Sequence, residues 1–460
     1  MTLTKLAIIS LSLAGLMLGF SLVRYGLGPQ KPPPNIVIFI ADDLSFDDLS
    51  TYDNSAPPTP NIDRLAKNGI RFDNVFLTTS SCSPSRASIL TGKHPTEHGL
   101  KELHGSLSAE ESTLGLRFKE AGYYTASAGK WHLGGATRNQ FDLIKNSKNQ
   151  HSGAEQWDDI ILGRPTDKPF FFWFAALDPH LPFHQDAPDL PPEIDPATIR
   201  IPRMLADRPA TRKALSRYYR EVRRFDEYVG HTVELLRSQN ILDNTIIIVM
   251  SDNGRPFALS KLMLYDSGIR APFIVHWPDH IKKAAVSEAL ISAIDIVPTL
   301  LEAANVTPAD DIQGRSFYDQ FRSPSSQHRT AIFAEQNWHS TDAHRRAVRT
   351  LTHLYIENQH PAMGNCKNAA SKSMRGARDL VMAYNDGDLS KWYEQCFANT
   401  LTPKELYAID ANGQMIFDNL AGAAENAASE TELAKKLAEW RASIGDTDFT
   451  PASDPRKNRR

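Results

Sequence analysis

Three unbroken apolar runs stand out along the chain, and polar residues follow each of them directly. The runs are residues 35–40 (NIVIFI), 170–177 (FFFWFAAL) and 245–250 (TIIIVM). Continuous β-branched and aromatic residues without alternation are typical of strands that are buried on both faces of a parallel sheet. We therefore expect an α/β fold in which three buried strands end in candidate functional residues.

Helical periodicity occurs between these runs. Apolar residues recur at three- and four-residue spacing over residues 215–236, which predicts one long amphipathic helix over about 210–239. Its basic residues are expected on the solvated face: Arg217, Arg220, Arg223 and Arg224. Shorter helices are expected over 59–66 and over 116–121, where Gly122 would end the second helix.

The two ends of the chain differ from its body. Residues 6–23 are apolar or small throughout and are flanked by Lys5 and Arg24, which indicates an export signal or a membrane anchor within residues 1–30. No A-x-A-like cleavage site follows, so we favour an uncleaved anchor with the body exported to the periplasm or the extracellular space. The body is expected to divide into a main domain over 31–330, a smaller subdomain over 331–444 and a flexible tail over 445–460.

Composition narrows the range of partners. The 460 residues include 51 Lys and Arg and 54 Asp and Glu, a net charge of −3, and the body lacks a long basic run. Nucleic-acid binding therefore has no support. Three cysteines are too few for a disulfide framework. If Cys82 is chemically converted, Cys366 and Cys396 would either form one disulfide or remain two free thiols.

Acidic residues follow the first and the third apolar run. Asp42 and Asp43 come directly after the first run, and adjacent carboxylates at the end of a buried strand repel each other unless a cation lies between them. Asp252, Asn253 and Gly254 follow the third run and combine a carboxylate, an amide oxygen and a residue that permits a tight turn. A solvated turn is the alternative for each pair, but their positions favour a shared metal site.

Residues 80–91 (SSCSPSRASILT) are dense in hydroxyls just before an expected helix. Small capping residues at a helix N-terminus gather backbone N–H groups and the positive end of the helix dipole, which favours an anion such as sulfate or phosphate. An isolated cysteine beside a helix cap is more often a small buried residue. The spacing of Cys82, Pro84 and Arg86 instead indicates an activated nucleophile.

Further candidate residues are basic. Lys130 and His132 lie two residues apart on an extended segment, so they point to the same side and can converge on one anion. His180 follows the second apolar run, at the strand end where open α/β sheets place their ligands. The remaining candidates for substrate contact, each of which has an ordinary surface or loop position as its alternative, are His98, His104, His184 and His339.

These segments together resemble the type I sulfatases of the alkaline phosphatase superfamily, in which the cysteine is oxidised after translation to formylglycine. The resemblance rests on C-S-P-S-R at 82–86 followed by T-G, on D-D at 42–43, on G-K-W-H-L-G at 129–134, on P-H-L-P at 179–182 and on S-D-N-G at 251–254. It covers most of the chain. The compact D-N-G-R-P-F segment and the following L-Y-D-S-G look more like the heparan N-sulfatase (sulfamidase) branch.

The resemblance implies an α/β fold with a large mixed, mostly parallel sheet sandwiched by helices, as in alkaline phosphatase, and a smaller C-terminal antiparallel-sheet subdomain. It implies hydrolysis of sulfate esters or sulfamates on a sulfated saccharide, after a formylglycine-generating enzyme has converted Cys82. One calcium ion would be held by Asp42, Asp43, Cys82, Asp252 and Asn253, since oxygen ligands rich in carboxylate favour calcium over zinc.

Each basic residue then takes a role by the same resemblance. Lys130, His180 and Lys261 would bind the sulfate oxygens, and Arg86 would steady the geminal diol of hydrated formylglycine. His132 would remove the proton of the second hydroxyl, and His180 would protonate the leaving group.

Two rival functions stay open. One is a phosphodiester or phosphonate monoester hydrolase of the same superfamily, which parallel assays of sulfate and phosphate esters would distinguish. The other is a membrane-tethered protein that binds sulfated glycans without turnover, and mass spectrometry of unconverted Cys82 would favour it. The sequence leaves open which sulfated substrate is used and whether its sulfate is N- or O-linked.

Overall fold

The fold was analysed in a computed structural model that describes residues 32–146, 151–339, 342–359, 375–389, 393, 397 and 400–446. The expected anchor at 6–23 and the pair Cys366 and Cys396 lie outside these residues. Within the described part of the chain, no helix is both long and apolar enough to cross a membrane.

The main sheet has nine strands in the order β4-β3-β5-β1-β6-β7-β2-β8, with β9 paired to β2. The strands are β1 (Asn35–Ala41), β2 (Ile70–Phe76), β3 (Tyr124–Gly129), β4 (Leu143–Asn146), β5 (Phe170–Ala175), β6 (Thr245–Ser251), β7 (Arg270–His276), β8 (Ala285–Ser287) and β9 (Ile291–Ser292). Five adjacent strands from β4 to β6 run parallel, and β7 is antiparallel to both its neighbours. The expected mixed, mostly parallel sheet is confirmed.

The three apolar runs form neighbouring strands at the centre of this sheet. β1 lies between β5 and β6, and all residues of β5 and β6 are buried. The ring of Trp157 stacks on Phe174 at a centroid distance of 5.3 Å and tilts against Phe39 at 5.2 Å. Large aromatic and β-branched side chains therefore fill the core on both faces of the strands.

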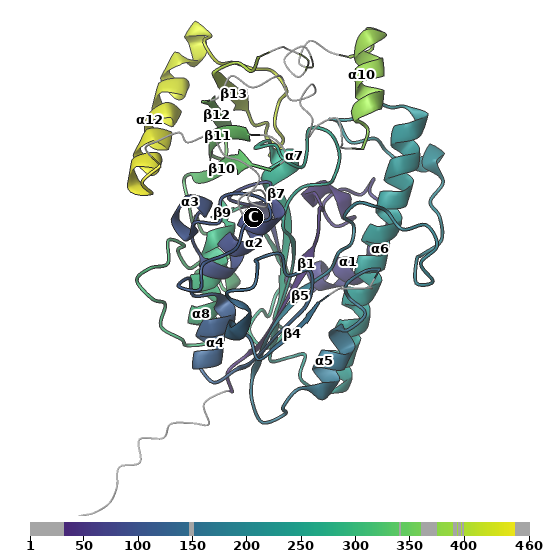
Figure 1. The fold of residues 1–460 in the computed structure, drawn as a ribbon, viewed down its shortest axis with the longest axis vertical. Coiled ribbons are helices and arrows are strands. Elements are labelled where there is room, and N and C mark those ends of the chain that lie inside the picture. Colours follow the sequence, from purple (N-terminus) through teal and green to yellow (C-terminus); the bar gives the residue numbers. More distant parts are fainter. Residues whose placement is uncertain are drawn as a thin grey trace, which may run out of the picture. The chain divides into compact units, whose positions relative to one another are not determined.

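Helices cover both faces of the sheet (Figure 1). One side carries α1 (Pro60–Lys67), α5 (Trp157–Gly163) and the 30-residue α6 (Pro209–Ser238). The other side carries α2 (Cys82–Thr91), α4 (Leu114–Glu120) and α8 (Ile296–Ala303). Shorter elements are α3 (Pro95–His98), α7 (Asp266–Ile269), η1 (Phe46–Asp48), η2 (Arg138–Gln140), η3 (Pro196–Thr198), η4 (Ala293–Asp295), η5 (Tyr318–Phe321) and η6 (Ala424–Asn426).

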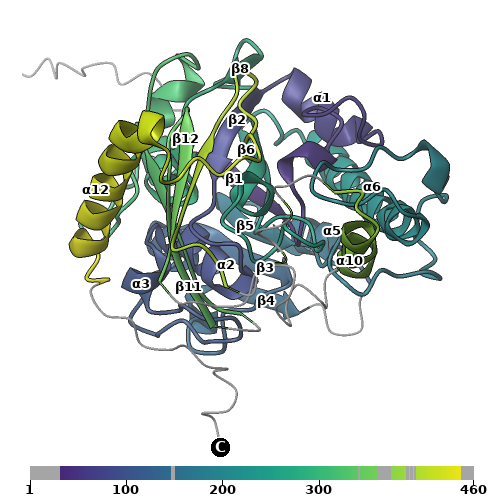
Figure 2. The same ribbon diagram turned by 90° about the horizontal axis from the view of Figure 1, so that it is seen from above.

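A second sheet follows in the C-terminal part. It is antiparallel and consists of β10 (Ile332–Trp338), β11 (Asp342–Arg349), β12 (His353–Asn358) and β13 (Lys404–Ala408), and α10 (Ala377–Asn385) precedes its last strand. α12 (Ala427–Ser443) lies along this sheet (Figure 2), where the Trp440 ring stacks on Phe333 at 5.0 Å. The expected smaller antiparallel sheet is confirmed.

The described part of the chain includes the first two residues of the expected tail, 445 and 446. Asp446 is buried and accepts hydrogen bonds from Arg346 Nε at 2.7 Å and Arg346 Nη2 at 2.8 Å. This ion pair ties the end of α12 to β11. The rest of the expected tail, from residue 447, lies outside the described residues.

Candidate active site

The register of the central strands brings the two acidic segments together. Ala41 pairs with Ser251 in the parallel β1–β6 ladder, so the next residues, Asp42 and Asp252, leave the sheet side by side. The backbone N–H of Asp42 donates to the carbonyl oxygen of Asp178 at 2.8 Å, which joins the segment after β5 to the same edge. Three strand ends thus deliver their polar residues to one place.

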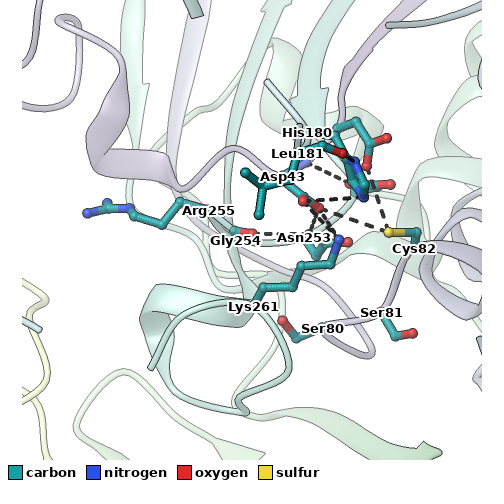
Figure 3. Close-up of polar contacts among 12 residues, drawn as sticks. Asp43, Ser80, Ser81, Cys82, His180, Leu181, Asn253, Gly254, Arg255 and Lys261 are labelled. Atoms are coloured by element: carbon teal, nitrogen blue, oxygen red, sulfur yellow. Dashed lines mark hydrogen bonds and ion pairs between the residues drawn. The ribbon is translucent and has the colours of Figure 1, made fainter. Parts of the chain in front are cut away.

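Cys82 is the first residue of α2, and its side chain points into this acidic edge (Figure 3). Its Sγ lies 3.7 Å from Asp42 Oδ1 and 4.0 Å from Asp43 Oδ1. Burial raises the pKa of the Cys82 thiol to about 12, although nearby Lys130 and Lys261 act in the opposite direction. The unmodified thiol is therefore neutral at ordinary pH and is a poor nucleophile.

Two lysines neutralise the adjacent carboxylates. Lys130 Nζ lies 2.5 Å from Asp42 Oδ2, and Lys261 Nζ donates to the two oxygens of Asp43 at 2.6 and 2.8 Å. Burial acts to raise the pKa of Asp43, but Lys261 and His180 outweigh it and hold that pKa below its ordinary value. Both carboxylates are completely buried, so opposite charges are required to keep them ionised there.

Arg86 connects three segments of the site. Its buried guanidinium donates from Nε to Asp252 Oδ2 at 2.7 Å and from Nη1 to the carbonyl oxygen of Lys130 at 2.7 Å, and Nη2 lies 3.8 Å from Asp42 Oδ1. Gly129, just before Lys130, has φ +93°, and a Cβ there would lie 1.8 Å from a carbonyl oxygen at the end of β5. Glycine is therefore needed where the Lys130 segment turns into the site.

Three histidines lie beside the basic residues. His104 Nδ1 and His132 Nε2 are 2.8 Å apart, and His339 Nδ1 lies 2.8 Å from Ser81 Oγ. Burial, assisted by Lys130, lowers the pKa of His132 well below its ordinary value, so its ring is neutral. His132 Nδ1 is buried without a hydrogen-bond partner among the described residues.

His180 comes from the loop after β5. Its Nε2 lies 3.7 Å from Asp43 Oδ2, and its Nδ1 contacts the carbonyl oxygen of Leu181. The pKa of His180 is lowered, chiefly by burial, although the negative charge of Asp43 acts to raise it. The ring is partly exposed and can meet a ligand from solvent.

The acidic edge has the ligands that a hard divalent cation requires. Asp42 and Asp43 are completely buried, and Asn253 Oδ1 is buried without a hydrogen-bond partner in the described part of the chain. Asn253 Nδ2 donates to Asp43 Oδ1 at 2.5 Å, and the backbone N–H of Asp43 donates to Asp252 Oδ1 at 3.2 Å. Ligand atoms of Asp42, Asp43, Cys82 and His180 lie within 4.8 Å of one another. With Asp252 and the free amide oxygen beside them, this carboxylate-rich set fits calcium better than zinc.

Two of the expected substrate contacts lie elsewhere. His98 is buried, and its Nε2 lies 3.1 Å from Ser88 Oγ beneath α2, so it belongs to the core between α2 and α3 and not to the mouth of the site. His184 is partly exposed, but Glu221 accepts a hydrogen bond from its backbone N–H at 2.5 Å and lies 3.1 Å from its Nδ1. The structure thus engages His184 with α6.

The prediction that the basic residues of α6 lie on a solvated face is wrong for Arg224. Arg224 is buried and donates to both oxygens of buried Asp178, whereas Arg217, Arg220 and Arg223 are partly exposed. Sequence analysis missed Arg224 and Glu221 because charged residues were assigned to solvent. No local pattern marked them, because their partners, His184 and Asp178, come from a distant segment of the chain.

Two family models match this chain. A family model described as Sulfatase matches residues 34–306, more than half of the chain, and a model described as N-sulphoglucosamine sulphohydrolase, C-terminal, matches residues 257–359.

Three curated relatives illustrate the range of sequence identity and coverage. Human N-sulphoglucosamine sulphohydrolase is 34% identical over 305 residues, covering 59% of this chain and 60% of the relative. Human N-acetylgalactosamine-6-sulfatase is 28% identical over 62% of this chain and 65% of its own length. An ulvan-active sulfatase from Formosa agariphila is 25% identical over 93% of this chain and 77% of its own length. The chain therefore spans less than two thirds of the length of both human relatives.

Solved structures extend the likeness of the fold. A protein in complex with its substrate D-glucosamine-2-N,6-O-disulfate superposes with a TM-score of 0.70 at 22% identity, covering 90% of this chain and 99% of that one. A phosphonate monoester hydrolase from Silicibacter pomeroyi gives 0.68 at 19% identity, with coverages of 89% and 96%. At such identities the likeness concerns the fold alone, and it confirms the expected alkaline phosphatase-like architecture.

Proposed function

The chain belongs to the sulfatase family, and on this basis we propose that it hydrolyses sulfate esters or sulfamates of a sulfated saccharide. The observation that carries the proposal is the meeting of Cys82, two buried aspartates and two lysines at one sheet edge. The names of the relatives support the substrate class, because the human proteins are described as acting on sulfated amino sugars. We further propose that the body is exported, as expected from residues 6–23.

Cys82 is proposed to be converted to formylglycine. Its C-S-P-S-R setting at the start of α2 supports this conversion, and the neutral state of the buried thiol argues against direct attack by a thiolate. The hydrate of formylglycine supplies an oxygen nucleophile for attack on sulfur. A formylglycine-generating enzyme is therefore a required partner during maturation.

A calcium ion is proposed at the acidic edge, held by Asp42, Asp43, Asp252 and Asn253 together with the oxygen derived from Cys82. The free Oδ1 of Asn253 supports this assignment. When bound, calcium withdraws charge from the sulfate oxygens and lowers the pKa of the nucleophile.

The remaining residues of the site take roles that follow from their charge and position. Lys130 and Lys261 carry ammonium groups beside Cys82 and are suited to bind sulfate oxygens and to stabilise their charge. Arg86 fixes Asp252 and the Lys130 segment through its two 2.7 Å hydrogen bonds. His132 is held neutral and is proposed as the proton acceptor, and partly exposed His180 is proposed to protonate the leaving group.

The test uses the full chain coexpressed with a formylglycine-generating enzyme. Mass spectrometry of the peptide around Cys82 should show the aldehyde, and the protein should release inorganic sulfate from glucosamine N-sulfate or glucosamine 6-sulfate in the presence of calcium. Cys82→Ala is the matched inactive control. A matured protein that hydrolyses phosphonate monoesters faster than every sulfated substrate would overturn the assignment, and one that binds sulfated glycans without turnover would favour a binding protein.

A further inference from the structure

A cavity of about 340 Å³ lies beside the candidate active site but contains none of its residues. Its walls come from the segment that follows Asp43, from residues 200–204 and from residues 414–417. Four arginines and three aspartates line it, and we call it the arginine cavity: Arg200, Arg203, Arg255 and Arg270 with Asp47, Asp53 and Asp266. A volume of this size accommodates a small ligand.

Each aspartate of the arginine cavity already has a cationic partner. The pairs are Asp47 with Arg255, Asp53 with Arg200 at 2.7 Å, and Asp266 with Arg349 at 3.0 Å. The negative charges of the wall are therefore neutralised before any ligand enters. Arg203 and Arg270 remain as lining arginines without a carboxylate within 4.0 Å among the described residues.

Arg270 is the buried member of this pair. Its side chain donates to the carbonyl oxygens of Asp73 at 2.8 Å and of Gly413 at 2.6 Å, and its guanidinium stacks 4.1 Å from the centre of the Phe46 ring. Only 5% of the residue is exposed. Burial lowers the pKa of Arg270 below its ordinary value, with Asp266 acting against it. A buried cation whose direct hydrogen bonds go to neutral carbonyl oxygens is stabilised further when an anion binds beside it.

Arg203 approaches from the other segment of the wall. Its guanidinium stacks 5.2 Å from the centre of the Phe417 ring, and Nη1 donates to Gln414 Oε1 at 3.1 Å. Stacking on a phenyl ring fixes the plane of a guanidinium and leaves its N–H edge for a ligand. Two oriented guanidinium groups in one cavity match the planar or trigonal oxygens of a carboxylate or a sulfate.

We propose that the arginine cavity binds an acidic sugar residue, with its carboxylate or sulfate between Arg203 and Arg270. Asn54 and Ser55 line the same cavity and offer partners for sugar hydroxyls. The site goes beyond the proposed reaction, and only the choice of a saccharide as ligand rests on the proposed function. An acidic polysaccharide would then be held at a second point while another of its residues is processed.

One hydroxyl joins the arginine cavity to the acidic edge. Buried Ser45, two residues after Asp43, accepts from the backbone N–H of Arg255 at 2.9 Å and donates to the carbonyl oxygen of Ser267 at 2.9 Å. Arg255 and Ser267 both line the cavity. The same loop therefore forms a wall of the cavity and presents the first pair of acidic residues.

The experiment measures binding of glucuronate, which carries a carboxylate and no sulfate, to the full chain with Cys82→Ala by isothermal titration calorimetry. Arg203→Gln and Arg270→Lys should each weaken binding about tenfold or more, as expected for a lost hydrogen bond to a charged group. Arg217→Gln is the matched control, because that partly exposed arginine does not line the cavity. Lys130→Ala should leave glucuronate binding unchanged, which separates this site from the proposed active site.

The proposal is overturned if glucuronate does not bind, if the Arg203 and Arg270 variants bind it as tightly as the parent, or if neutral N-acetylglucosamine binds equally well. Circular dichroism and thermal unfolding of Arg270→Lys establish that the variant is folded, and exposed Arg203 provides a variant with little structural risk. If the matured full chain releases no sulfate but glucuronate still binds to the arginine cavity, the proposed reaction is refuted and the proposed binding site is not.

Discussion

Arg224 holds Asp178 through two hydrogen bonds, from Nε to Oδ2 at 2.8 Å and from Nη2 to Oδ1 at 2.5 Å, and both side chains are buried. Three residues earlier on α6, Glu221 accepts a hydrogen bond from the backbone N–H of His184 at 2.5 Å. One face of α6 thus fixes both ends of the segment 178–184, which contains His180. The helix is a positioning element for a residue of the proposed active site.

Arg224→Lys keeps the charge but loses the planar pair of hydrogen bonds. We expect kcat to fall between about tenfold and a hundredfold through misplacement of His180. In a double-mutant cycle with His180→Ala, the Arg224 substitution should cause little additional loss of kcat. The partly exposed Arg217→Lys is the control on the same helix. Equal losses of kcat in the presence and absence of His180 would refute the positioning role.

Removal of calcium tests the acidic edge. A chelator should abolish sulfate release, and calcium added back at about 100 times its Kd should raise the free energy of unfolding by about 2.7 kcal/mol. Asn253→Ala should reduce this stabilisation at the same calcium concentration, because it removes the free amide oxygen. Differential scanning calorimetry with and without calcium measures the effect. If calcium does not raise the melting temperature of the parent protein, the proposed calcium site is contradicted.

His104 is expected to position His132. The 2.8 Å contact between His104 Nδ1 and His132 Nε2 fixes the tautomer of His132 and directs its other nitrogen for proton transfer. His104→Ala should lower kcat about tenfold to a hundredfold with little change in KM, because misorientation of the base loses part of the roughly 10²- to 10⁴-fold contribution of general base catalysis. His104→Asn, which can restore one hydrogen bond, should recover part of the loss.

The control for this prediction is His231→Ala, an exposed histidine on α6 that should leave kcat unchanged. A change confined to KM in His104→Ala would instead indicate that His104 contacts the substrate, as sequence analysis suggested.

Asp295 predicts a defined loss of stability in acid. Burial acts to raise its pKa, but Arg329 and His328 outweigh burial and lower the pKa to about 2. Because the folded-state pKa is below the ordinary value of 3.8, the contribution of Asp295 to stability is complete above pH 4 and is lost as the pH falls toward 2. Its full size is about 2 kcal/mol.

Urea unfolding of Asp295→Asn measures this contribution. The difference in free energy of unfolding from the parent protein should be largest at neutral pH and should narrow between pH 4 and pH 2. Asp310→Asn, an exposed aspartate in the same part of the chain, is the control and should show no such trend. A constant difference for Asp295→Asn over this range would contradict the role of its charge.

Sequence patterns predicted the centre of the fold because its strands consist almost entirely of apolar residues. The runs that became β1, β5 and β6 lack alternation and each is followed by polar residues, so Asp42, His180 and Asp252 were identified before any contact was known. Cys82 was identified separately, from its C-S-P-S-R motif. The antiparallel insertion of β7 was not predicted, because pairing between strands distant in sequence leaves no local pattern.

Burial of charge was the other feature that the sequence did not reveal. Arg224 and His98 were both placed near solvent, yet each is buried with a specific partner, Asp178 in one case and Ser88 in the other. Asp178 lies 46 residues from Arg224, and Ser88 lies ten residues from His98 in a neighbouring helix, so composition and helical spacing identify neither partner. The structure supplied these pairs through tertiary contacts alone.

The loop held by the Ser45 hydroxyl separates the proposed active site from the arginine cavity. Arg255 and Ser267 line the arginine cavity, and the hydroxyl ties the backbone of both residues to the loop that bears Asp43. Ser45→Ala would therefore affect both sites. Binding of an acidic saccharide in the cavity and the rate of sulfate release would change together, because both depend on the same loop.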